Sequence, residues 1–161
     1  MIRRCTINDL DFVNYILTDD SVYPHISEDN TPEDIKNKMA EIYLSTPLIH
    51  VLSPNKYSIF IYIPITSIMY EVHSNVLPEG RGKAALKALN ESMKWIFENT
   101  ICRKIISWIP MCNRLALTFA INSGAKKQGH ITESFVKYGE LHDQLIYGIT
   151  QEEWICQRQS Q

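Results

Sequence analysis

The stretch Tyr70–Asn99 decides the fold of this chain, and its sequence is YEVHSNVLPEGRGKAALKALNESMKWIFEN. Its first residues predict a buried strand, which Pro78 ends because proline has no N–H to donate to a neighbouring strand. Gly80 and Gly82 predict a turn in which the backbone can adopt positive φ and approach another group closely. From Lys83 onward, alanine, leucine and other apolar residues at helical spacing predict a long helix. The stretch is therefore a strand, a glycine-containing basic turn and a helix.

The start of this helix is a candidate binding site for phosphate. The first N–H groups of a helix have no partner within it, and the helix dipole adds partial positive charge. Arg81 and Lys83 add two full charges beside them. A tight turn with no ligand is the alternative interpretation of Gly80 and Gly82. The residues match neither the loop of P-loop nucleotide hydrolases nor the G-x-G-x-x-G of Rossmann domains, which argues against both.

The turn resembles the acetyl-CoA pyrophosphate loop of the GNAT superfamily of N-acetyltransferases. That loop is often P-E-x-R-G-K-G-x-G, and residues 78–83 have the sequence PEGRGK. Ala84 and Leu86 stand where the family has its last two glycines.

A second stretch carries the same resemblance. Residues 113–125 have the sequence NRLALTFAINSGA, similar to the family motif N-x-x-A/S-x-x-x-Y-x-x-x-G-F. Asn113 and Gly124 match this motif, whereas Ala120 and Ala125 stand at its tyrosine and phenylalanine positions.

The remaining sequence predicts further strands and helices in an order typical of that family. Strands are expected at 2–7, 48–52, 57–63, 66–77, 104–109, 128–138 and 141–149. Helices are expected at 9–17, from 31, from 83 and at 113–123, with a loop at 18–30 and a short helix or tail at 151–161. The order is β-α-α-β-β-β-α-β-α-β-β. The resemblance implies one α/β domain over 1–161 with the GNAT fold: a mixed, mostly antiparallel, splayed sheet of about seven strands with about four helices.

Composition sets limits on the function. The chain has 161 residues, 45% of them hydrophobic and 21% charged, which suits one globular domain. A net charge of −2 argues against a general nucleic-acid-binding protein. No apolar run has the length of a membrane helix, and no signal peptide is evident at the N-terminus. Four scattered cysteines without a C-x-x-C pair argue against a zinc site. We expect a cytoplasmic protein with no metal and no membrane or nucleic-acid partner.

The resemblance implies acetyl-CoA as the cofactor, bound between the fourth and fifth strands. The pantetheine arm would pair with backbone groups of the fourth strand, and the pyrophosphate would bind amides of the glycine turn. The cofactor-binding residues implied in this way are Val76, Leu77, Arg81, Gly82, Lys83, Ala84 and Asn113.

The fourth strand also carries candidate catalytic residues. Side-chain alternation places Glu71, His73 and Asn75 on one face, where three polar residues are unexpected for a core. In the GNAT family a glutamate on this strand is often the base, so Glu71 or His73 could accept the amine proton, directly or through water. A structural histidine and a glutamate paired with a lysine are the alternative.

The acid for the leaving thiolate is left open by the sequence. The family often uses the tyrosine that is Ala120 here. Either the thiolate leaves without a fixed acid, or Tyr138 or Tyr147 supplies the proton, or the protein is not an efficient catalyst.

The loop at 18–30 lies, by resemblance, beside the acceptor site. Tyr23 and His25, together with Asn75, are therefore candidate acceptor-binding residues. The loop has four carboxylates, those of Asp19, Asp20, Glu28 and Asp29. They would form an acidic rim that favours a cationic acceptor, and a solvated loop is the alternative interpretation.

The resemblance implies an acetyl-CoA-dependent N-acetyltransferase. It would move an acetyl group to a primary amine of a small molecule or a protein, by direct attack in a ternary complex. The alternative is a catalytically degenerate GNAT-fold protein acting as a binding or virion-assembly module, because the chain also resembles small acetyltransferase-like proteins of tailed bacteriophages. In that case we expect it in the host cytoplasm. A homodimer is compatible with either function.

Overall fold

A seven-stranded sheet forms the centre of the computed structural model, which describes residues 2–159. The strand order is β1-β2-β3-β4-β5-β7-β6, and all neighbours are antiparallel except β4 and β5. The strands are β1 (Arg3–Arg4), β2 (His50–Asn55), β3 (Ser58–Pro64), β4 (Met69–Val76), β5 (Lys104–Pro110), β6 (Lys126–Lys137) and β7 (Glu140–Thr150). The predicted order of strands along the chain and the mixed, mostly antiparallel sheet of about seven strands are confirmed.

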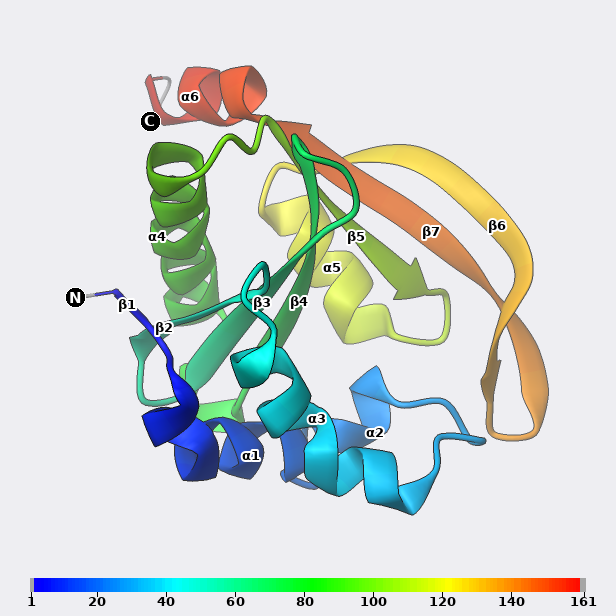
Figure 1. The fold of residues 1–161 in the computed structure, drawn as a ribbon. Helices are drawn as coiled ribbons and strands as arrows, with labels where there is room; N and C mark the ends of the chain where they lie inside the picture. The colour runs from blue at the N-terminus through cyan, green and yellow to red at the C-terminus, as the bar shows by residue number, and fades with distance from the viewer. Residues whose placement is uncertain (1, 160–161) are drawn as a thin grey trace.

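Helices cover both faces of the sheet (Figure 1). They are α1 (Leu10–Thr18), α2 (Tyr23–Ile26), α3 (Glu33–Ser45), α4 (Lys83–Asn99), α5 (Arg114–Asn122) and α6 (Gln151–Gln159). Six α-helices are thus present in residues 2–159, against about four predicted. The four predicted helices are all found, and α6 is the short helix that was one of the two alternatives for 151–161. The single turn α2, within the predicted loop, is the addition.

The first predicted strand is shorter in the structure. It was expected to span residues 2–7, but β1 holds two residues and a 3-10 turn follows at Ile7–Asp9. The carboxylate of Asp9 accepts the N–H of Thr6 at 2.8 Å, which satisfies a donor at the start of the turn. Local capping therefore ends the strand early.

The two faces of β4 belong to two different cores. Val72 pairs with Tyr62 and packs in the cluster beneath α4, which also contains Met93 and Ile96. The opposite face of the sheet packs against α1 and α3, and Ile61, the partner of His73, belongs to that cluster. Strand alternation thus keeps the side chains of Glu71, His73 and Asn75 on one face, as predicted, and the structure shows that this face is directed toward α1 and α3.

Strands β4 and β5 pair over only three residues each. The parallel register joins Met69–Glu71 with Lys104–Ile106. Beyond this point β4 stays paired with β3 through Val76, while β5 stays paired with β7 through Pro110. The sheet therefore opens between the two strands.

The hairpin of β6 and β7 extends from the sheet as a long curved arm (Figure 1). Register shifts between Lys127 and Gly129 and between Ile131 and Phe135 mark irregular pairing, which bends a strand. At the turn, Gly139 has φ +71°, a conformation that glycine adopts without strain.

Helix α6 closes the far end of the sheet against α4. Trp154 packs on Phe97 with ring centroids 5.4 Å apart, and its indole N–H donates to Asn90 Oδ1 at 3.2 Å.

Among the helices within residues 2–159, none combines the length and apolar character needed to span a membrane.

We predict that Glu153 makes the stability of the chain fall at acid pH. Its carboxylate accepts hydrogen bonds from Lys126 Nζ (2.7 Å) and the Thr150 N–H (2.9 Å), which lower its pKa from 4.5 to about 2. Because the folded pKa lies below the unfolded one, this contribution is complete above about pH 4.5 and is lost as pH falls toward about 2. Glu153→Gln should lower the melting temperature by about 1–3 °C near neutral pH, and by less under acid.

Thermal unfolding of both proteins across this pH range checks the prediction. Glu152→Gln is the matched control, because Glu152 is the exposed neighbour on the same helix. If the difference in melting temperature between Glu153→Gln and the unmodified protein stayed constant with pH, the role of Glu153 would be contradicted. An equal effect of Glu152→Gln would contradict it too.

Candidate functional site

A groove with a volume of about 610 Å³ runs between the start of α4, the free edge of β4 and helix α5. Gly82 is the N-cap of α4 and has φ +73°, which strains any residue with a side chain. No atom lies within 4 Å of the position that a Cβ on Gly82 would take, so the backbone is open to a ligand there. The first N–H groups of α4, from Lys83 to Ala85, point out of the helix end. This end of the groove is suited to an anionic group.

The free edge of β4 forms one wall of the groove through Ser74 and Val76. The N–H of Leu77 donates to Tyr57 O at 2.9 Å, toward β3. Since backbone groups of successive strand residues point to opposite edges, those of Val76 and Ser74 point toward the opening. Leu77 is also buried, 4% exposed, on the α1 side. Leu77, a predicted cofactor-binding residue, therefore does not line the groove, whereas Ser74 does.

Arg81 and Asn113 line the groove, but their side chains already have partners. The Arg81 guanidinium donates to Ser21 O at 2.7 Å and to Val76 O at 3.4 Å. Asn113 caps α5 by accepting the N–H of Ala116 at 3.1 Å, and its amide donates to His25 O at 3.1 Å. Both residues attach the segment between α1 and α3 to the groove.

The same segment is attached to the hairpin arm at its other end. Lys137 Nζ donates to Ser27 O at 2.8 Å, and the Asp29 carboxylate accepts the N–H of Gly139 at 2.8 Å. This hydrogen bond is the main cause of a lowered pKa at Asp29, helped by the N–H of Tyr138 and the charge of Lys137. The hairpin and the α2 segment thus close over the open part of the sheet.

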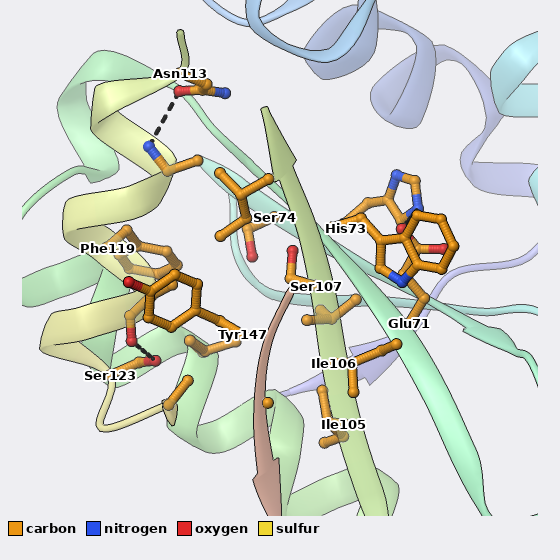
Figure 2. A pocket seen from close by; sticks show the side chains of 18 of the residues that line it. Glu71, His73, Ser74, Ile105, Ile106, Ser107, Asn113, Phe119, Ser123 and Tyr147 are labelled. Carbon is orange, nitrogen blue, oxygen red and sulfur yellow. Dashed lines mark hydrogen bonds and ion pairs between the residues drawn. The ribbon is translucent and has the colours of Figure 1, made fainter. Parts of the chain in front are cut away.

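A second cavity, of about 250 Å³, lies where β4 and β5 separate. It adjoins the groove, because His25, Ser74, Ala116 and Phe119 line both. Figure 2 shows Glu71 and His73 on one side of β5, and Phe119, Ser123 and Tyr147 near α5 on the other. The opening therefore connects the two faces of the sheet.

Glu71 and His73 form the polar end of this cavity. His73 Nε2 lies 3.2 Å from Glu71 Oε1, yet the two are not aligned for a hydrogen bond, and Nε2 is buried without another partner. Burial, and then the negative charge of Glu71, raises the pKa of the Tyr43 hydroxyl on α3. The two side chains as a whole are partly exposed, and a carboxylate in contact with an imidazole can hold and pass on a proton.

The structure separates the two tyrosines that the sequence left as alternatives. Tyr147 on β7 lines the cavity, whereas Tyr138 lies at the hairpin turn and is 74% exposed. Ser107 lines the cavity as well, and strand pairing places it opposite Tyr147. Ser107 was missed because the sequence alone gives no β5–β7 register.

Other predicted residues lie outside this cavity. Tyr23 packs under the ammonium of Lys36, 4.6 Å from its ring centre, and lines neither cavity nor groove. Asn75 is 1% exposed and buried against the α1 side, so its assignment to the acceptor site is corrected. Of the predicted acceptor residues, His25 alone lines the cavity.

The predicted acidic rim is not part of the cavity wall. Its four carboxylates all belong to residues that the structure describes, and none of them lines the cavity or the groove. Asp19 accepts hydrogen bonds from the hydroxyl and N–H of Ser21, which lower its pKa, and Asp29 is tied to the hairpin. Glu71 is the carboxylate that faces the opening. Within residues 2–159 there is also no cluster of three metal-ligating side chains.

The family model described as "Protein of unknown function (DUF2824)" matches residues 4–159. The chain belongs to this family. No curated protein matches the sequence.

Solved structures share the architecture. A spermidine N-acetyltransferase from Vibrio cholerae, in complex with CoA and spermine, superposes with a TM-score of 0.76 at 18% identity. That match covers 96% of this chain and 97% of the other. A ribosomal-protein-S5-alanine acetyltransferase from Vibrio fischeri gives a TM-score of 0.73 at 13% identity, covering 95% and 93%. At these identities the likeness shows the fold, and this DUF2824 chain has the GNAT fold.

Proposed function

We propose that this DUF2824 protein is an acetyl-CoA-dependent N-acetyltransferase that acts on a primary amine. The observation that carries the proposal is the adjacency of two hollows: the groove at the start of α4 and the edge of β4, and the cavity that holds Glu71 and His73. The relatives in fold that act on spermidine and on a ribosomal protein support an amine acceptor.

The groove has the donors and the shape that acetyl-CoA needs. The N–H groups of Lys83, Ala84 and Ala85, with the Lys83 ammonium, would hold the pyrophosphate. The backbone groups of Ser74 and the N–H of Val76 would pair with the amides of the pantetheine arm, as an added strand does; the Val76 carbonyl already accepts from Arg81 Nε at 3.4 Å. Apolar side chains of α5, such as Phe119, would cover the arm from the other side.

The acceptor amine would approach from the α1–α3 face. Its nitrogen bonds to the acetyl carbon, the C–S bond breaks, and the products are an amide and a thiol. Bound acetyl-CoA supplies the thioester for this reaction. Glu71 or His73 takes the proton that the nitrogen loses. The hydroxyl of Tyr147, across the opening, gives a proton to the leaving sulfur.

We predict that Lys83→Glu weakens CoA binding by about 10–100-fold, because a charge-assisted contact is replaced by repulsion. Lys87→Glu is the matched control: Lys87 is exposed one turn further along α4 and does not line the groove. Calorimetric titration of both variants with CoA checks this. Equal affinities for the two variants and the unmodified protein would sink the phosphate-site assignment.

Glu71→Gln and His73→Ala, made separately, should leave CoA affinity unchanged and lower turnover. The variant that lacks the proton acceptor should lose about 100-fold in kcat, the usual size of general-base catalysis. Thiol release from acetyl-CoA with a panel of primary amines measures this. If both variants retain full turnover, the base lies elsewhere; CoA binding without thiol release for any amine would favour the non-catalytic alternative.

Tyr147→Phe should lower kcat about 10-fold or more and leave the KM for the acceptor within about twofold, because only proton donation to sulfur is lost. Tyr138→Phe, at the exposed hairpin turn, is the control. An unchanged kcat in Tyr147→Phe would mean that the thiolate leaves without this acid.

A further inference from the structure

The cavity at the opening of the sheet extends further than an acetyl group requires. Beyond Ser74 and Ser107 it continues between α4, α5 and β7, as far as Met93, Ile149 and Tyr147. Figure 2 shows this end of the cavity beside Phe119, Ser123 and Tyr147. It lies on the face of the sheet where the cofactor groove runs, on the side of the opening away from Glu71 and His73.

The walls of this inner end are apolar. Helix α5 contributes Ala116, Phe119, Ala120 and Ser123, at the spacing of one helical face. The Ser123 hydroxyl already donates to Ala120 O at 2.7 Å, so it offers no free donor to a ligand. The apolar residues Leu89, Met93, Ile105, Ala125 and Ile149 form most of the remaining wall, with the ring of Tyr147 and the hydroxyl of Ser107 beside them. Glu71 and His73 are on the other side of the opening, and His25 lies beside the start of α5, where its carbonyl accepts the amide of Asn113.

Small residues of α5 and of the loop that follows it create the space. Ala120 is 8% exposed and faces the cavity from the middle of α5, and Ala125 faces it just after the helix. An acetyl group needs roughly twice the 30 Å³ of a water molecule, whereas the whole cavity measures about 250 Å³. For scale, an apolar cavity of about 150 Å³ in another protein accepts benzene. The whole cavity, which includes the Glu71–His73 end, is therefore several times larger than an acetyl group, and part of the remaining space lies at the apolar end.

We propose that the natural acyl donor is longer than acetyl: a linear or branched acyl thioester of CoA with about four to six carbons, its tail against Ala120, Ala125 and Met93. This inference rests on the proposed function and specifies its donor. The reaction is otherwise the same, with the amine nitrogen bonded to the acyl carbon and the sulfur released as the thiol.

Burial of the acyl tail determines how much more tightly a longer acyl-CoA should bind. Each methylene group moved from water into an apolar cavity tightens binding about fourfold. Butyryl-CoA, with two more methylene groups than acetyl-CoA, should therefore bind about 10–20-fold more tightly. CoA without an acyl group measures the contribution of the groove alone.

The experiment is calorimetric titration of the whole chain with CoA, acetyl-CoA, butyryl-CoA and hexanoyl-CoA. The proposal expects CoA to bind and the affinity to rise from acetyl to butyryl. Binding of CoA with acetyl-CoA as the best or an equal donor overturns the acyl proposal and leaves the proposed function standing. Absence of CoA binding overturns the proposed function, and this inference with it.

A second experiment fills the cavity with a larger side chain. Ala120→Phe should reduce the preference for butyryl-CoA over acetyl-CoA to about threefold or less, with little change in the affinity for CoA. Ile121→Phe introduces the same side chain one residue later, at a position where the native isoleucine is 56% exposed. This variant should keep the full preference for butyryl-CoA over acetyl-CoA. Ala125→Leu narrows the cavity from a different element if Ala120→Phe lowers the melting temperature. Retention of the preference in a folded cavity-filling variant would contradict the proposal.

Discussion

The short parallel pairing of β4 with β5 is the constraint on which the rest of the site depends. Three residues on each strand are paired, and the strands then follow different neighbours. A fully paired β4 would have no free backbone edge, and Glu71 and His73 would lie on a closed sheet. Because the pairing stops at Glu71 and Ile106, a strand edge, a polar pair and an apolar cavity meet at one place. Unpaired backbone groups inside a protein need partners, and an extended ligand can supply them.

The two faces of the opening carry different chemistry, and strand alternation is the reason. Glu71 and His73 point toward α1 and α3, where the attached α2 segment and the hairpin turn form a cover. Ser74 on β4 and Tyr147 on β7 point toward α4 and α5, where the groove runs. A reaction that joins two substrates is served by such an arrangement, because each substrate enters from its own side. Under the proposed function, the bond between them forms in the plane of the sheet.

Much of the fold could be predicted from local signals. Pro78, Gly82 and the alanine-rich start of α4 fix the turn after β4, and their identities are specific to that geometry. The alternation that separates Glu71 and His73 from Val72 is likewise a local property of one strand. The α2 turn was missed because its four residues have no amphipathic repeat and contain a proline.

The parts of the site that the sequence could not supply all depend on register between distant elements. Nothing local shows that the N–H of Leu77 is taken by Tyr57, or that Asn75 is buried against the α1 side. Nor does the sequence show which tyrosine reaches the opening: Tyr147 is set by the β5–β7 register, and Tyr138 by the hairpin turn. Arg81 and Asn113 match family motifs, yet their side chains hold the α2 segment, a contact that only the tertiary structure reveals.

The most direct measurement is an NMR titration of the ¹⁵N-labelled chain with CoA, followed through the backbone amide signals. If the free edge of β4 and the start of α4 form the cofactor site, the largest shifts will fall at Ser74, Val76 and residues 82–85. The amides of α6, at the far end of the sheet, will remain unchanged. Saturable shifts confined to other surfaces, or none at millimolar CoA, would contradict the central claim that the opening between β4 and β5 binds the cofactor.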